Sequence, residues 1–232
     1  SVGQIVMTAK KLAAIVPISN DLLMYSNDIS VDAWVRDDLV QVLSIREDRA
    51  FLRDDGTENK PKGIRHWMAN DHVLGSSGTG SADIEEDFKT LINALEGSDI
   101  RMERCVWLMH PRSKNHLVNL RDSGGNLVYP EMRGTSPTLY GFPVLTTTSI
   151  PVNLGGGGNE TEVYLVDMAH VVVGEVNTID IAVDASAAYV DGSELISTFA
   201  RDEVAVRAIM RHDIAMRHEQ AAAVISDVAW GA

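Results

Sequence analysis

The chain has 232 residues, of which 45% are apolar and 23% are charged, and its formal net charge is −13. This composition is typical of a folded globular protein and excludes a disordered chain, a collagen-like repeat and a disulfide-stapled scaffold. The single cysteine, Cys105, can form no internal disulfide, which is typical of a reducing compartment. No apolar run approaches the roughly 20 residues of a membrane-spanning helix, and residues 1–11 do not resemble a signal peptide, so we expect no membrane association.

The first half of the chain predicts a strand followed by a long helix. Loosely alternating apolar residues between positions 5 and 16 indicate one or two strands that end at Pro17. From Ser30, a residue type common at helix N-caps, apolar residues recur with helical spacing as far as residue 53. The Gly- and Ser-rich stretch 56–81 then predicts a long connection, which is typical of a functional loop or a change of domain.

The second half predicts further helices and strands. We expect a helix capped by Asp83 and closed by Gly97, a buried strand over 105–109, and a helix that starts at Pro111. The β-prone segments that follow are residues 144–150, 162–166, 171–173 and 179–183. Four consecutive glycines, 155–158, predict a mobile tip between the first two of these segments.

The segment 199–216 fits two structures. Val206, Met210 and Ile214 have helical spacing, whereas an alternating set favours a strand: Val204, Val206, Ala208 and Met210. We favour the strand.

The negative charge is concentrated in the middle of the chain. Residues 81–200 contain 7 Lys and Arg against 17 Asp and Glu. Residues 134–200 contain no Lys or Arg, and their acids are Glu160, Glu162, Asp167, Glu175, Asp180, Asp184, Asp191 and Glu194. We expect these acids to form a surface that repels phosphates, which argues against ordinary DNA or RNA binding.

The candidate nucleotide-binding, nucleophile and metal-binding patterns do not match the known motifs in full. The Gly-rich stretch 75–80 precedes a helix but matches neither a dinucleotide fingerprint nor a Walker loop, so a flexible linker is the better interpretation. Cys105 lies in an apolar strand, where a thiol is usually inert, and Ser113 and His116 lack a nucleophile elbow. Six of the seven histidines form pairs that lie six residues apart, a spacing unsuited to one helical metal site: His66/His72, His110/His116 and His212/His218. We therefore assign no catalytic, cofactor-binding or metal-binding residue.

The order of several segments carries a family resemblance. In the first half they are 16–23 (VPISNDLL), 47–52 (EDRAFL), 55–57 (DGT) and 61–64 (PKGI). In the second half they are 107–111 (WLMHP), 139–144 (LYGFPV), 163–167 (VYLVD) and 207–213 (RAIMRHD). Together they cover almost the whole chain, and their order resembles that of the major capsid proteins of tailed bacteriophages, which have the Hong Kong 97-type fold.

The resemblance implies an α+β fold with a long spine helix in a peripheral domain and a mixed α/β axial domain near the centre of a capsomer. On this basis we assign residues 1–83 and 195–232 to the peripheral domain, with the long helix at about 30–53, and residues 84–194 to the axial domain. Family members usually carry an N-terminal arm and an extended loop before the position where this sequence starts, so we expect an N-terminally truncated or incomplete chain. Some members crosslink through a Lys of that loop and an Asn of a neighbouring subunit, and neither residue can be assigned here.

Three functions follow as hypotheses. The first is a structural major capsid protein, with no enzymatic activity and no cofactor, that assembles into pentamers and hexamers of an icosahedral shell around double-stranded DNA. The long helix would be its rigid element, and the glycine-rich segments 75–80 and 155–158 its adjustable connections. The alternative is an encapsulin-like nanocompartment shell, and a small-molecule α/β enzyme is a third hypothesis that predicts a pocket with convergent polar groups.

The capsid hypothesis also implies partners and a location. The partners are other copies of the chain, scaffold, head protease and portal proteins, and packaged DNA in non-specific proximity. The location is the virion, after assembly in the cytoplasm of the bacterial host. An acidic subunit suits a wall to which DNA must not adhere.

Overall fold

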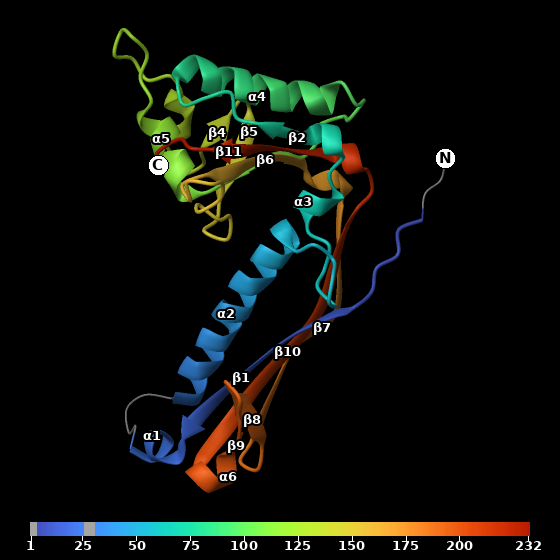
Figure 1. The fold of residues 1–232 in the computed structure, drawn as a ribbon, viewed down its shortest axis with the longest axis vertical. Helices are drawn as coiled ribbons and strands as arrows, with labels where there is room; N and C mark the ends of the chain where they lie inside the picture. The colour runs from blue at the N-terminus through green and yellow to red at the C-terminus, as the bar shows by residue number, and fades with distance from the viewer. Residues whose placement is uncertain (1–3, 26–30) are drawn as a thin grey trace.

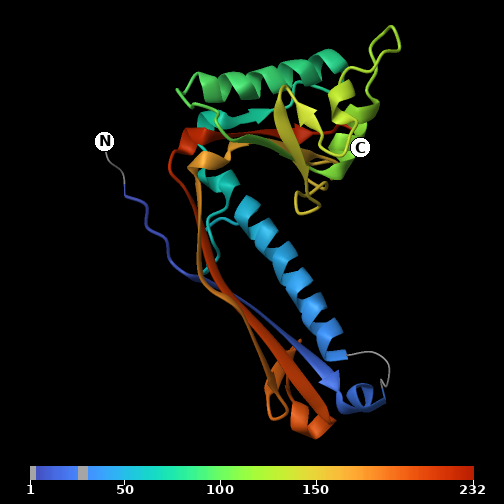
Figure 2. The same cartoon turned by 180° about the vertical axis from the view of Figure 1, so that it is seen from behind.

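The computed structural model describes residues 4–25 and 31–232. The molecule is elongated, with a long three-stranded sheet at one end and a six-stranded sheet at the other, as Figures 1 and 2 show from two sides. None of the described helices is long and apolar enough to cross a membrane.

The long sheet joins segments that are far apart in the sequence. Its strand order is β1-β10-β7, with both pairs antiparallel. The strands are β1 (Lys10–Ser19), β7 (Val171–Asp184) and β10 (Glu203–Met216). The register of β10 on β7 is interrupted on both sides of Arg211, which marks a β-bulge in the middle of the sheet.

Small elements surround the far tip of this sheet (Figure 1). They are the helices α1 (Asn20–Tyr25) and α6 (Thr198–Arg201) and the antiparallel hairpin of β8 (Ala188–Asp191) and β9 (Glu194–Ser197).

Helix α2 (Val31–Arg53) lies along one face of the long sheet (Figure 1). Four buried side chains at every fourth position, Val31, Val35, Leu39 and Leu43, pack with Val206 and Ala208 of β10. This i, i+4 spacing gives the helix one apolar face. Because each fully buried aliphatic side chain contributes about 1.5–3 kcal/mol, this face is what holds α2 on the sheet.

The six-stranded sheet has the order β2-β11-β6-β3-β5-β4. Its strands are β2 (Val73–Gly75), β3 (Cys105–Met109), β4 (Thr138–Leu139), β5 (Phe142–Thr146), β6 (Thr161–Asp167) and β11 (Ala222–Val228). The pairs β2–β11 and β3–β5 are parallel, and the remaining pairs are antiparallel.

Helices cover both faces of this sheet. On one face, α4 (Ser81–Glu96) and α5 (Pro111–Asn119) pack on alternate strand residues such as Trp107 and Leu165, and Phe88 of α4 contacts Trp107 and Trp230 edge-on. On the other face, α3 (Ile64–Trp67) and the end of α2 pack on the intervening residues, including Tyr164. The alternation of strand side chains thus separates two cores.

The described residues also contain four short 3₁₀ helices: η1 (Asn70–His72), η2 (Pro130–Met132), η3 (Met168–His170) and η4 (Glu219–Ala221).

Several sequence-based expectations are confirmed. The long helix is α2, although its expected cap, Ser30, lies outside the described residues. The strand over 105–109 and the helix from Pro111 are β3 and α5. The segment 199–216 forms mainly a strand, β10, preceded by the short α6, as favoured.

Other expectations need correction. The connection 56–81 is not loop alone, because it contains α3, η1 and β2. Helix α4 begins at Ser81, so Asp83 is its third residue and not its cap; the Asp83 carboxylate accepts a hydrogen bond from the Gly80 N–H at 3.1 Å. The strand expected over 144–150 ends at Thr146, and the two segments 171–173 and 179–183 are parts of the single strand β7.

The strands of the two sheets alternate along the chain. Strand β7 lies in the long sheet, whereas β11 near the C-terminus lies in the six-stranded sheet. Strand pairing joins residues that are distant in sequence, so the segment order alone does not reveal these memberships. The chain passes between the sheets at residues 167–171 and 216–222, and again between α2 and α3.

Candidate functional site: the joint between the two sheets

A buried carboxylate lies where the long helix meets the six-stranded sheet. Glu162 of β6 is only 2% exposed. Its Oε2 lies 3.4 Å from a guanidinium nitrogen of Arg53, the last residue of α2, and its Oε1 lies 3.4 Å from Nε of Arg65 in α3. The Tyr164 hydroxyl donates a hydrogen bond to the same carboxylate. One side chain therefore ties together α2, α3 and β6.

The partners of Glu162 explain how its negative charge is tolerated inside the protein. A buried carboxylate costs several kcal/mol unless it is paired and hydrogen-bonded, and here two guanidinium groups and a phenol supply those contacts. Burial, and then the charge of Glu162, raises the pKa of Tyr164 well above its usual range, so the hydroxyl stays protonated and can donate.

Two acids that we expected on the acidic surface are inside the protein. Glu162 and Asp167 are both buried, and Asp167 accepts hydrogen bonds from the backbone N–H groups of Arg104 and Ala169. The expectation of an acidic face was therefore wrong for these two residues.

Further contacts fix α3 in the joint. The Trp67 indole N–H donates to the Ile214 carbonyl of β10 at 3.3 Å, and the Lys62 ammonium lies 4.2 Å from the Trp67 ring centre. The backbone N–H of Gly63 donates to the Asp54 carbonyl at 2.7 Å. The joint thus links the end of α2 to both sheets.

A second buried cluster connects α2 to β10 near the bulge. His212 is buried, its Nδ1 lies 2.9 Å from Oε1 of Glu47, and the Phe51 ring contacts the imidazole edge-on at 4.8 Å. Burial, followed by the nearby Glu175 charge, raises the pKa of Glu47, and burial lowers the pKa of His212. Both shifts favour the neutral forms of Glu47 and His212 in this second cluster between α2 and β10.

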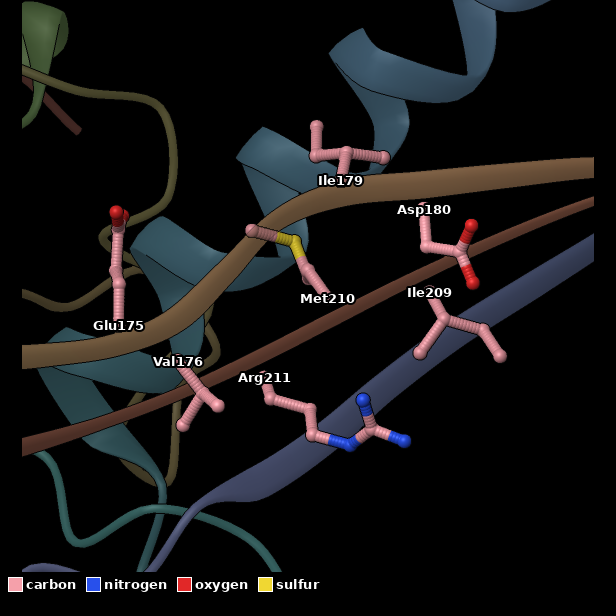
Figure 3. A pocket seen from close by; sticks show the side chains of 7 residues that line it. All are labelled: Glu175, Val176, Ile179, Asp180, Ile209, Met210 and Arg211. Atoms are coloured by element: carbon pink, nitrogen blue, oxygen red, sulfur yellow. The ribbon is translucent and has the colours of Figure 1, made fainter.

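A recess of about 620 Å³ lies at the bulge between β7 and β10. It is lined by Glu175, Val176, Ile179, Asp180, Ile209, Met210 and Arg211 (Figure 3). In Figure 3 the Glu175 side chain points to the side of the sheet opposite to Asp180 and Arg211. The charged groups that line the recess therefore do not converge on one point. The enzyme hypothesis would require such convergence.

The glycine-rich stretch 75–80 is anchored and is not the flexible linker that we expected. Asp87, buried in α4, accepts hydrogen bonds from the Ser77 N–H and the Ser76 hydroxyl, both at 2.8 Å. The Trp230 indole N–H donates to the Gly78 carbonyl at 2.9 Å. The Asp87 carboxylate thus occupies the Ser77 N–H, a group that a phosphate cradle would have to offer to its ligand.

The histidines of the spaced pairs have separate structural roles. His72 contacts the Ala222 carbonyl and the Ser98 hydroxyl, both at 3.1 Å, and Nδ1 of His110 accepts the hydrogen bond that caps α5. His66 is exposed, and His218 stacks edge-on against His170. Within residues 4–25 and 31–232, no three His, Cys, Asp or Glu side chains gather as metal ligands would.

The two nucleophile candidates are buried in the six-stranded unit. Burial, and then the Asp167 charge, raises the pKa of the Cys105 thiol to about 12. The Ser113 hydroxyl and Nε2 of His116 are buried, and neither has a hydrogen-bond partner among the described residues. His116 is therefore not hydrogen-bonded to Ser113 as an activating base would be.

Sequence reasoning missed Glu162 as the central residue of the joint. The available signal was weak: an acid directly before the apolar run 163–166. Its partners Arg53 and Arg65 lie about a hundred residues earlier in the chain, so no local pattern connects them to it.

Known sequences resemble this chain over nearly its whole length. A model of the phage capsid family matches residues 1–227. The major capsid protein of Klebsiella oxytoca phage phiKO2 is 35% identical over 219 residues, which are 92% of this chain and 50% of that protein. The capsid polyprotein of Pseudomonas phage PAJU2 is 26% identical over 215 residues, which are 88% of this chain and 31% of that protein. The chain thus spans half, or less, of the length of these curated relatives.

Solved structures share the fold. The capsid of an empty GTA particle superposes with a TM-score of 0.74 at 17% identity, covering 96% of this chain and 74% of that one. A structure from Mycobacterium phage Adephagia superposes with a TM-score of 0.72 at 15% identity, covering 96% of this chain and 72% of that one. An encapsulin complex from Synechococcus elongatus PCC 7942 superposes with a TM-score of 0.61 at 13% identity, covering 95% of this chain and 74% of that one. The expected α+β fold of the Hong Kong 97 type is confirmed.

Proposed function

Because the chain belongs to the phage capsid family, we propose that it is the shell-building region of a major capsid protein of a tailed phage or prophage. Its copies form pentamers and hexamers of an icosahedral shell that encloses double-stranded DNA. The strongest support is that the likeness to a capsid subunit runs over 96% of the chain, so nearly every element has a counterpart there. The proposed location is the virion, after assembly in the bacterial cytoplasm.

The domain division in this proposal follows the sheets. The long sheet with α2, residues 10–53 and 171–216, is the peripheral unit. The six-stranded sheet with α3, α4 and α5, residues 64–167 and 219–232, is the axial unit near the capsomer centre. These boundaries replace 84 and 194, because each unit then keeps its own sheet and its own core.

The architecture suits a subunit that must occupy slightly different positions in one shell. Such a subunit needs rigid parts joined at a defined place. The Glu162 cluster fixes α2 on the six-stranded sheet, whereas the long sheet can bend at the bulge near Arg211. The anchored stretch 75–80 no longer serves as an adjustable connection in this proposal.

The exposed acids support a wall that does not bind the packaged genome. Five acids of the stretch without Lys or Arg are exposed: Glu175, Asp180, Asp184, Asp191 and Glu194. They repel DNA phosphates. We infer a structural protein without enzymatic activity or cofactor, whose further partners are scaffold, head protease and portal proteins.

The encapsulin-like alternative has weaker support, since its TM-score is 0.61 against 0.74 for a capsid. A gene for a cargo enzyme next to the gene for this chain would favour a nanocompartment. Genes for a portal protein and a head protease would favour a phage shell.

Expression of the gene that encodes this chain, followed by negative-stain electron microscopy and sedimentation analysis, tests the proposal. We expect five- and six-membered rings or closed shells. A product that sediments as a monomer at all concentrations would contradict it.

A further inference from the structure

The hairpin of β8 and β9 ends in a turn that contains an Asp–Gly pair, Asp191 and Gly192. The chain has one other such pair, Asp55–Gly56, and no Asn–Gly pair. In an Asp–Gly pair the side-chain carboxyl carbon can reach the next backbone nitrogen by closing a five-membered ring, and glycine has no side chain to shield that nitrogen. Whether the two groups react depends on how the fold holds them, and it holds the two pairs differently.

The turn at Gly192 is weakly held. Strands β8 and β9 form a sheet of their own, and a two-stranded hairpin is only marginally stable in water. The ladder places Asp191 directly opposite Glu194, and like charges in this arrangement are destabilising. The next pair, Val190 and Leu195, is 67% and 76% exposed, so it contributes little burial. The loop end of the hairpin therefore opens easily.

The surroundings of the turn leave the reacting groups accessible. Asp191 and Gly192 are exposed, and among the described residues no backbone hydrogen bond uses the Gly192 N–H. Figure 1 shows the hairpin beside the far tip of the long sheet, away from the six-stranded sheet. Its base is fixed, because the Thr198 hydroxyl lies 3.0 Å from the Ala185 carbonyl and 2.9 Å from the Ala187 carbonyl. The fold thus anchors the base of the hairpin and not its turn.

The other Asp–Gly pair is held at both reacting groups. Oδ1 of Asp55 accepts hydrogen bonds from the Thr57 N–H at 3.1 Å and from the Thr57 hydroxyl at 2.8 Å. The Gly56 N–H donates to the Pro61 carbonyl at 3.1 Å. The Thr57 bonds also lower the pKa of Asp55, and the ionised carboxylate that they favour loses an oxygen less readily than a protonated carboxyl does. Asp55–Gly56 is therefore a matched internal comparison for Asp191–Gly192.

We propose that Asp191–Gly192 is a site of spontaneous backbone modification, at which Asp191 is converted to isoaspartate, whereas Asp55 is protected. The Gly192 nitrogen attacks the side-chain carboxyl carbon of Asp191, and the new C–N bond closes a succinimide ring. One water leaves, made from the amide hydrogen and the hydroxyl of the protonated carboxyl. Water then adds to either carbonyl of the ring: addition at the side-chain carbonyl restores aspartate, and addition at the main-chain carbonyl gives isoaspartate. Water is the only co-reactant, and no atom is oxidised or reduced.

The product changes the shape of the hairpin. In isoaspartate the main chain runs through the side-chain carbon and gains one methylene, while the former main-chain carboxyl becomes the side group, so the net charge is unchanged. The lengthened turn no longer matches the two-residue loop that pairs Asp191 with Glu194. Modified hairpins accumulate with the age of a copy. This inference does not depend on the proposed function.

Incubation of the folded protein at neutral pH for several weeks tests the proposal. The chain is then digested with the protease Asp-N, which cleaves before aspartate but not before isoaspartate, and the peptides are quantified by mass spectrometry. We expect cleavage before residue 191 to fall with time and cleavage before residue 55 to stay constant. In water enriched in heavy oxygen, the modified peptide should gain one heavy oxygen atom, as hydrolysis of a succinimide requires. Unchanged cleavage before residue 191, or an equal loss at both residues, would overturn the proposal.

Asparagine variants give a matched kinetic comparison, because asparagine forms the same succinimide with loss of ammonia. In the folded protein Asp191→Asn should deamidate roughly tenfold faster than Asp55→Asn, since the hydrogen bonds at position 55 and Gly56 must open first. In urea, where neither turn is formed, the two rates should become similar. Equal rates in the folded protein, or a ratio in urea as large as in the folded protein, would show that the fold does not select the site and would overturn the proposal.

Discussion

Gly63 lies against the backbone of Ala50 so closely that a Cβ atom at position 63 would stand 2.8 Å from the Ala50 carbonyl oxygen. The same atom would stand 2.6 Å from the Arg53 backbone nitrogen. Backbone atoms at the end of a packed helix cannot move aside as a flexible side chain can. The close approach of α3 to the end of α2 therefore depends on the absence of a side chain at this position.

Gly63→Ala should lower the free energy of unfolding by roughly 1–3 kcal/mol, because the added methyl overpacks the joint. Chemical denaturation followed by tryptophan fluorescence measures the loss. The control is Gly156→Ala, where a Cβ would meet no atom within 4 Å and the backbone is outside the left-handed region. Equal stability of the two variants would show that the joint tolerates the displacement.

Replacement of the central carboxylate tests the joint in a second way. Glu162→Gln leaves Arg53 and Arg65 without a counter-charge, and it should cost about 2 kcal/mol. This is less than for a fully buried pair because both guanidinium groups are partly exposed. Denaturant titration measures the change. Glu194→Gln, on the exposed hairpin, should stay within about 0.5 kcal/mol of the parent protein.

A third variant refines this test. Tyr164→Phe keeps the carboxylate and both arginines and removes only one hydroxyl, so it should destabilise less than Glu162→Gln. If Tyr164→Phe cost more, the phenol rather than the paired charge would dominate the joint.

The contrast between α2 and Glu162 shows what the sequence could predict. Helix α2 follows from its own residues, because apolar positions four apart define its buried face whatever the sheet contributes. Strand β3 and helix α5 likewise carry local signals, an apolar run and a Pro at the helix start. The burial of Glu162 depends on Arg53 and Arg65, which the fold brings together from distant segments.

The same reason explains the error at the linker and the sheet memberships that the segment order did not reveal. The stretch 75–80 reads as flexible because its composition does not reveal its anchors, one of which, Trp230, lies 152 residues away from Gly78. The sheet memberships of β7 and β11 depend on pairing partners that neither strand's own sequence identifies. Local periodicity therefore predicts elements, whereas the joint and the sheet memberships depend on how elements combine.

The N-cap of α5 should make the protein sensitive to acid. Nδ1 of His110 accepts a hydrogen bond from the Arg112 N–H at 3.0 Å, which a protonated nitrogen cannot do. Burial, and then the charge of Arg112, lowers the pKa of His110 below 6.5. The unfolded chain binds this proton at higher pH than the folded chain does, so stability falls as the pH drops below about 6.5.

His110→Asn separates the cap from its titration, because asparagine caps helices well and does not ionise in this range. Between pH 7 and pH 5 the variant should lose less stability than the parent protein, by up to about 1 kcal/mol. Burial also lowers the pKa of His116, which acts in the same direction, so part of the acid sensitivity should persist. Parallel pH profiles for parent and variant would exclude a titrating cap.

Cys105 offers a probe of the six-stranded sheet, because it is the one cysteine of the chain. This thiol is buried in β3, and its pKa is raised to about 12, so almost none of it is ionised to thiolate at pH 8. We expect a disulfide reagent to modify Cys105 only in step with unfolding, whereas the exposed thiol of a Val176→Cys variant should react at once. Rapid modification of Cys105 in the native protein would show that β3 opens without global unfolding.

The same shift predicts the response to alkali. The folded pKa of Cys105 lies above the value of 9.0 for a free thiol, so the unfolded chain releases this proton first. Stability that is present below pH 9 is therefore lost as the pH rises toward 12. Burial raises the pKa of Tyr129 and Tyr164 in the same direction, which adds to the loss. In denaturant titrations at pH 8 and pH 10.5, we expect the midpoint to be lower at pH 10.5, and an unchanged midpoint would mean that these groups are accessible in the folded protein.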